Sequence, residues 1–117
     1  MGEVVTKYQR ALQIWSILIC AAKDRKTYTY GGVADILGFE GAGVMGGMLG
    51  PIMRYCDEND LPPLTVLVVN QETGLPSSGL ITVTKKNMHQ RREEVFNFDW
   101  FGEEPPQTED FERADKG

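Results

Sequence analysis

Apolar side chains recur at spacings of three and four along the first half of the chain, as they do on one face of an α-helix. This pattern predicts a first helix over residues 4–23. Thr29 is suited to cap a second helix over about Tyr30–Leu37, and Gly38 is suited to close it. A third helix is predicted over about residues 42–58. Two helices joined by a glycine-containing turn have the order of a helix-turn-helix.

The second half of the chain changes to an extended pattern. The β-branched run Leu64–Val69 predicts a strand, residues 70–79 are rich in turn formers, and residues 80–84 alternate like a returning strand. These segments predict a two-stranded β-wing with a long tip. A fourth helix is predicted over about residues 88–100, whereas residues 103–117 lack periodicity and are expected to be disordered.

The pattern over residues 1–102 therefore predicts a single α+β domain that is mainly helical. The predicted fold is a winged helix-turn-helix with a two-stranded β-wing and a C-terminal helix. The chain of 117 residues has a net charge of −5. Residues 1–98 hold ten basic and ten acidic residues, whereas residues 99–117 hold seven acids and two bases. Most of the excess negative charge belongs to the predicted acidic tail, so the domain is nearly neutral. This charge argues against a nonspecific, highly basic nucleic-acid binder.

The sequence offers few residues that could act in catalysis or bind a metal. His89 is the only histidine and stands in a polar run, and the segment Gly43–Gly47 follows a helix and lacks the lysine of a phosphate loop. Cys20 and Cys56 have neither a disulfide framework nor zinc spacing, and we expect buried free thiols. We predict no enzyme, no cofactor and no metal. The apolar run Ile14–Ala22 is too short to span a bilayer, so we expect a cytoplasmic protein without a membrane partner.

Eight of the thirteen glycines lie within residues 31–50, and they lower the stability of the predicted helices. Glycines on one helix face commonly allow another backbone to come close. That backbone could belong to the first helix, which is the favoured interpretation, to a nucleic acid or to another protein. Pro51 lies inside the third helical pattern and is expected to kink or break it.

A nucleic-acid surface has partial support. The first residues of the third predicted helix, residues 40–44, include no Arg, Lys, Asn or Gln, which indicates weak reading of base edges. Basic residues elsewhere could contact phosphates, or they could simply form a solvated face. These residues are Lys23, Arg25, Lys26, Arg54, Lys85, Lys86, Arg91 and Arg92.

Several short motifs occur in an order that is similar to a known family. They are Tyr8-Gln9, Ile14-Trp15, Thr29-Tyr30-Gly31, Val33-Ala34, Ala42-Gly43-Val44-Met45-Gly46-Gly47 and Ser77-Ser78-Gly79. Over about residues 8–80 the chain resembles the DNA-binding domain of the alkylguanine-DNA alkyltransferase and alkyltransferase-like family. The resemblance implies a winged helix-turn-helix that binds the DNA minor groove and flips a damaged base.

The same resemblance implies that the repair chemistry is missing. The family's Pro-Cys-His-Arg motif falls on residues 69–72, so that Asn70 replaces the nucleophilic cysteine. An amide cannot act as a thiolate acceptor of an alkyl group. The family's arginine finger falls on Gly43, and only the tyrosine that assists rotation of the nucleotide has a match, Tyr30.

Two functions follow as hypotheses. The first is a non-catalytic winged-helix protein that binds double-stranded DNA as a regulator or a damage sensor. Its contacts would come from Tyr30, Ala42, Gly43, Arg54, Lys85, Lys86, Arg91 and Arg92, with Asn70 as the degenerate active-site position. The alternative is a protein–protein interaction module that has kept the fold and lost the DNA surface. Its partner would bind the glycine-rich third helix or the acidic tail.

Overall fold

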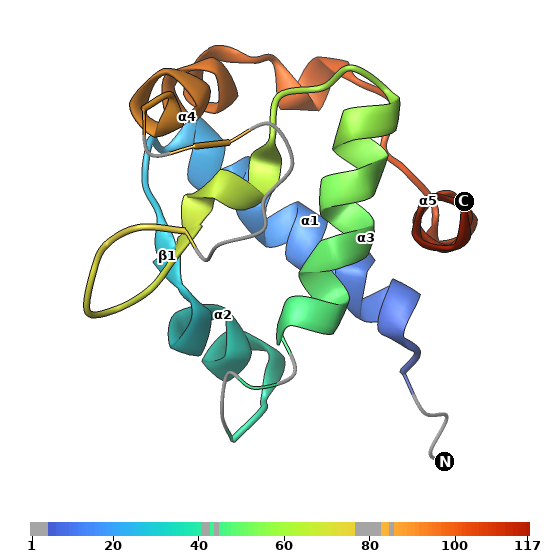
Figure 1. Ribbon diagram of the computed structural model, residues 1–117. Coiled ribbons are helices and arrows are strands. Elements are labelled where there is room, and N and C mark those ends of the chain that lie inside the picture. The colour runs from blue at the N-terminus through green and yellow to red at the C-terminus, as the bar shows by residue number, and fades with distance from the viewer. Residues whose placement is uncertain (1–4, 41–42, 44, 77–82, 85) are drawn as a thin grey trace.

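The computed structural model describes residues 5–40, 43, 45–76, 83–84 and 86–117. Its elements are α1 (Lys7–Lys23), β1 (Tyr28–Thr29), α2 (Tyr30–Leu37), α3 (Met45–Glu58), the 3₁₀ helix η1 (Leu64–Leu67), β2 (Val68–Val69), α4 (Met88–Asn97), the 3₁₀ helix η2 (Trp100–Gly102) and α5 (Thr108–Lys116), as Figure 1 shows. The described part is mainly helical with a small two-stranded sheet, so the α+β class is confirmed.

The first helix is confirmed and forms the centre of the fold. It begins after Thr6, whose hydroxyl accepts a hydrogen bond from the Gln9 amide at 3.1 Å, while the Gln9 side chain accepts one from the Thr6 amide at 2.8 Å. This capping box satisfies two backbone donors that the helix itself leaves unpaired. Trp15 is buried, and α1 packs against α3, α4, α5 and η1.

The second helix has the bounds and both caps that the sequence predicts. The Thr29 hydroxyl accepts the Gly32 amide at 2.9 Å, and Gly38 has a φ of 86°, the left-handed conformation that favours glycine. Val33 on this helix is buried, whereas Ile36 is 53% exposed.

The third helix is confirmed over Met45–Glu58. It continues through Pro51, which is buried, so this proline does not break it. Ala42 and Val44, at the predicted start of the helix, lie outside the described residues.

The predicted strand over residues 64–69 is largely wrong. Leu64–Leu67 forms the 3₁₀ helix η1, and only Val68–Val69 is extended, paired in parallel with Tyr28–Thr29. The whole run is buried among α1, α3 and α4, and a short, continuously apolar run does not by itself distinguish a strand from a buried turn of helix.

The predicted wing is not established by the described residues. The partner of β2 is the upstream strand β1, rather than a strand that returns after the turn. Of the expected return strand, residues 80–82 lie outside the described part of the chain, and Val83 and Thr84 belong to no strand.

The fourth helix is confirmed but ends earlier than predicted, at Asn97. The 3₁₀ helix η2 follows, and the indole nitrogen of Trp100 donates a hydrogen bond to the Val95 carbonyl at 2.8 Å. This bond satisfies the polar atom of a buried aromatic side chain and fixes η2 against the end of α4.

The prediction of a separate, disordered tail over residues 103–117 is wrong. Residues Thr108–Lys116 form α5, which packs on α1 and α3 and closes one side of the molecule (Figure 1). Gln107 and Asp110 form a capping box, and Phe111 is completely buried. The acidic composition concealed a short amphipathic helix whose buried residues are Phe111 and Ala114.

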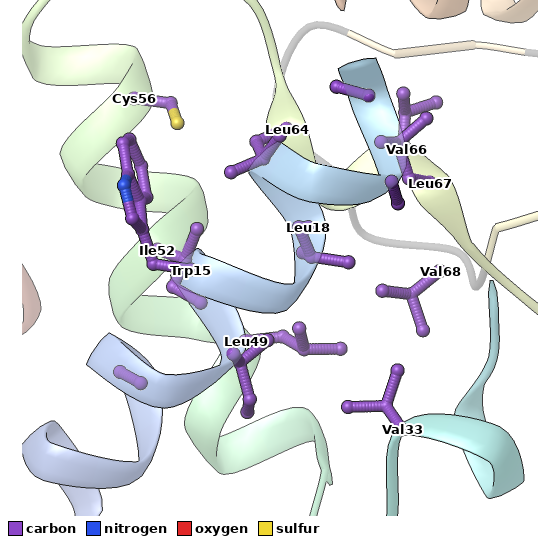
Figure 2. Packing of buried hydrophobic residues seen from close by; sticks show 14 of the residues in the cluster. Trp15, Leu18, Val33, Leu49, Ile52, Cys56, Leu64, Val66, Leu67 and Val68 are labelled. Atoms are coloured by element: carbon purple, nitrogen blue, oxygen red, sulfur yellow. The ribbon is translucent and has the colours of Figure 1, made fainter. Parts of the chain in front are cut away.

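One core joins these elements. Figure 2 shows side chains of α1, α2, α3 and the η1–β2 segment converging, among them Leu18, Val33, Leu49 and Val66. Toward α5 the core becomes aromatic, and Trp15 meets both Tyr55 and Trp100 at centroid distances of 5.6 Å. Within the described residues, no helix has the length and apolar character needed to cross a membrane.

Candidate functional site

Two of the predicted site positions, Tyr30 and Asn70, lie together. They line an open pocket of about 680 Å³ that also includes Gly31, Gln71 and Glu72. The parallel pairing of β1 and β2 explains this proximity, because Tyr30 directly follows β1 and Asn70 directly follows β2. We call this depression the Tyr30–Asn70 pocket.

The side chain of Asn70 organises the turn that it begins. Its amide oxygen accepts hydrogen bonds from the backbone N–H groups of Glu72 at 2.8 Å and Thr73 at 3.3 Å. The backbone N–H of Asn70 donates to the Leu75 carbonyl at 2.8 Å. Gly74 completes the turn with a φ of 69°. The residue at the degenerate active-site position thus has a structural role of its own, as asparagine commonly has in turns.

Arg54, predicted as a phosphate contact, faces α5. Its Nη1 atom lies 2.7 Å from a carboxylate oxygen of Asp115, whose other oxygen lies 2.9 Å from Lys7 Nζ and 2.9 Å from the Tyr8 hydroxyl. Hydrogen bonds from Lys7 and then Tyr8, together with the charge of Arg54, lower the pKa of the Asp115 carboxyl. This charge network holds the last turn of α5 against α1 and α3.

Lys86, Arg91 and Arg92, which were predicted to contact phosphates, do not form one open cationic face in the described part of the chain. Lys86 is exposed, but Arg91 is half-buried and forms an ion pair with Glu94 on the same helix. Arg92 is also half-buried, and its Nε and Nη2 atoms are enclosed without a hydrogen-bond partner in the described part of the chain. None of these three residues lines the Tyr30–Asn70 pocket. Lys85 and Ala42 lie outside the described residues.

The glycines at the start of α3 are exposed. A Cβ atom added to Gly43, Gly46 or Gly47 would meet no atom within 4 Å among the described residues. Gly50 differs, because a Cβ atom there would lie 2.9 Å from the Arg54 Nη1 atom that binds Asp115. The favoured interpretation, that these glycines let the first helix come close, is therefore wrong for all four. Gly50 instead leaves room for the Arg54 side chain of its own helix. We call Gly43, Gly46 and Gly47 the glycine face.

The charge near the glycine face is negative. The charged residues between the middle of α2 and the first turn of α3 are Asp35 and Glu40, and both are exposed. Beside them Ile36 presents an apolar side chain to solvent. The Arg10 guanidinium, on α1, lies 5.0 Å from the centre of the Phe39 ring. A phosphate backbone that approached along α2 would meet carboxylates, which is unfavourable.

The residues considered for catalysis or metal binding stand apart from one another. Burial raises the pKa of the Cys56 thiol to about 12, which makes it a poor nucleophile. Cys20 is exposed, so the expectation of two buried thiols holds for Cys56 only. His89 is exposed on the first turn of α4. No group of three or more metal-binding side chains gathers within the described ranges.

A groove that the sequence did not reveal lies at the other end of α3. It has a volume of about 540 Å³ and is bordered by the end of α3, the link before η1, and α4 with Phe98. Its half-buried apolar lining includes Met53, Leu61 and Phe98, and exposed Asp57 and Asp60 lie beside it. We call it the Asp57–Asp60 groove. The sequence signal that could have indicated it is the acidic end of the third helix, which is followed closely by Pro62 and Pro63.

Comparisons of the chain with protein-family models, with curated proteins and with solved structures found no match. The resemblance to the alkyltransferase family therefore stays a prediction.

Proposed function

We propose that this protein is a protein-interaction module whose docking surface is the glycine face at the start of α3. The observation that carries the proposal is the open space that the described residues leave beside Gly46 and Gly47, the second and third residues of α3. Glycine is a poorer helix former than alanine, by roughly 1 kcal/mol in a helix interior and by less at a fraying helix end. Since no atom of the described residues would contact a Cβ at either position, packing within that part of the fold does not require this loss.

Contact with a helix of a partner protein would explain why Gly46 and Gly47 carry no side chain. Without Cβ atoms, α3 allows another backbone to approach closely, as small residues do where helices pack tightly. The exposed Ile36 side chain adds apolar contact area at the edge. Asp35 and Glu40 favour a partner that carries Lys or Arg around its contact surface.

The test is the double variant Gly46→Ala/Gly47→Ala, compared with the wild type in affinity capture from cells and in sedimentation. We expect a folded variant that no longer associates with the partner, or with a second copy of the chain. Gly31→Ala is the matched control, because Gly31 is a helical glycine with equally open surroundings outside the glycine face. Association that survives in the double variant contradicts the proposal.

A second candidate function is non-catalytic DNA binding by a winged helix-turn-helix. It is favoured by the Tyr30–Asn70 pocket, which unites the two positions that the alkyltransferase resemblance connects with a flipped nucleotide. In this function the protein would sense or regulate without alkyl transfer, because Asn70 has no thiolate and its amide oxygen is engaged by the turn.

DNA binding is tested by fluorescence anisotropy of duplexes with and without an alkylated base, at low and moderate salt. A DNA binder should show a salt dependence that shrinks in Lys86→Ala, and it should lose its preference for the altered base in Tyr30→Ala. The full chain is required, because truncation after Gly102 would remove the buried Phe111. The absence of binding at low salt would eliminate this candidate.

A further inference from the structure

The Asp57–Asp60 groove combines an apolar lining with negative charge that the fold does not neutralise. Among the charged residues that line it, Glu94 is paired with Arg91. Asp57 and Asp60 are exposed, and neither forms an ion pair or a side-chain hydrogen bond in the described part of the chain. The groove therefore presents two unbalanced carboxylates beside half-buried Met53 and Phe98.

These carboxylates stand where they are unfavourable for α3. The C-terminal end of a helix carries a partial negative charge, so acids in the last turn are repelled and bases are preferred. The last turn of α3 contains no basic residue, and Asp57 and Glu58 lie in it. A cation supplied from outside the chain would relieve this repulsion.

Asp60 also occupies a backbone conformation that suits glycine. Its φ is 55°, and the Leu61 amide donates to the Cys56 carbonyl at 2.9 Å in a Schellman-type helix end. Glycine is the usual residue at this left-handed position, because a Cβ atom is disfavoured there. An aspartate at this point puts a carboxylate beside the groove at the expense of local backbone energy.

We propose that the Asp57–Asp60 groove binds an extended segment of a partner protein in which an apolar side chain is flanked by Lys or Arg. The apolar side chain would lie against Met53, Leu61 and Phe98, and the flanking cations would pair with Asp57 and Asp60. Pro62 and Pro63 in the wall have no N–H groups to pair with a partner strand, so recognition depends on side chains. This site is independent of the glycine face, and together the two surfaces would let the protein connect two partners.

The experiment is an NMR titration of the ¹⁵N-labelled full chain with synthetic peptides of equal length. One peptide places leucine between arginines, a second replaces the arginines with glutamates, and a third replaces the leucine with serine. We expect the first peptide alone to shift amide signals around Asp57, Asp60 and Phe98. Raising the salt concentration should weaken this binding, because the charges are exposed.

Two variants separate binding from folding. Asp60→Gly retains the turn, since glycine suits its conformation, and it should weaken binding of the arginine–leucine peptide about fivefold, the loss of one exposed charge pair. Glu103→Gln removes an exposed acid that directly follows η2, outside the groove, and should leave the affinity unchanged. Equal affinity of wild type and Asp60→Gly overturns the proposal. Equal shifts with the glutamate peptide, or shifts confined to other surfaces, overturn it as well.

Discussion

Two acidic helical segments of this protein, α5 and the end of α3, look alike in composition but differ in how the fold uses their charges. In α5 the acids Glu109 and Asp110 lie in the first turn and Lys116 lies in the last, an arrangement that matches the helix dipole. Asp115 is paired with cations of α1 and α3. At the end of α3, Asp57 has no such partner in the described part of the chain. Charges that the fold neutralises stabilise it, whereas the acids at the end of α3 oppose the helix dipole and lie where we propose that a partner binds.

The largest expected effect tests whether α5 belongs to the core. Phe111→Ala removes a completely buried ring that meets Tyr55 at a centroid distance of 5.5 Å. We expect the free energy of unfolding to fall by about 3–5 kcal/mol, the usual result of deleting a buried phenylalanine. Urea denaturation measures this change. Phe101→Ala is the matched control, because Phe101 is 59% exposed and its loss should change stability by less than about 0.5 kcal/mol.

If Phe111→Ala were as mild as Phe101→Ala, α5 would not be anchored as described, and its comparison with the end of α3 would fail.

The missed helix shows which features local sequence can predict. The bounds of α2 were predictable because the Thr29 cap and the Gly38 turn are determined by their immediate neighbours. α5 was not, because its stability depends on the contacts of Phe111 with helices distant in sequence. The segment 64–69 failed for a similar reason, since burial on all sides removes the alternation that identifies a strand.

The candidate sites, too, have some features that the sequence predicts and others that only the structure shows. The glycine enrichment was visible in the sequence, but only the structure distinguishes Gly50, which accommodates Arg54, from Gly46 and Gly47, which face open space. The positive φ of Asp60 has no reliable sequence signal, because aspartate adopts it only occasionally.

The second prediction concerns this difference between glycines. Gly46→Ala/Gly47→Ala should raise the free energy of unfolding by at most about 2 kcal/mol, because alanine favours the helix, both positions lie in its first turn, and a Cβ meets no atom of the described residues there. Gly50→Ala should give no such gain, since its Cβ would crowd the Arg54 guanidinium that binds Asp115. Thermal unfolding of both variants provides the comparison. A destabilised double variant would mean that the glycine face is required by the fold itself.

The third prediction tests the charge network of α5 through pH. In Asp115→Asn the ion pairs with Lys7 and Arg54 are lost, and stability at neutral pH should fall by about 1 kcal/mol, the scale of partly exposed pairs. The folded-state pKa of Asp115 is lowered, so its contribution is complete above the ordinary aspartate pKa of about 3.9. The contribution is lost as the pH falls through the lowered pKa. The stability difference between wild type and variant should therefore shrink only in acid, and a difference that changes near neutral pH would contradict this origin.

The smallest expected effect sharpens the contrast at the end of α3. Asp60→Asn removes a negative charge near the helix C-terminus and should stabilise the fold by a few tenths of a kcal/mol, roughly 0.3. Asp60→Gly also relieves the left-handed backbone, for a total gain of roughly 0.5–1 kcal/mol. Urea denaturation of both variants separates the effect of charge from that of conformation. If either substitution lowers stability, the Asp60 carboxylate stabilises the fold, and the end of α3 would then resemble α5 rather than differ from it.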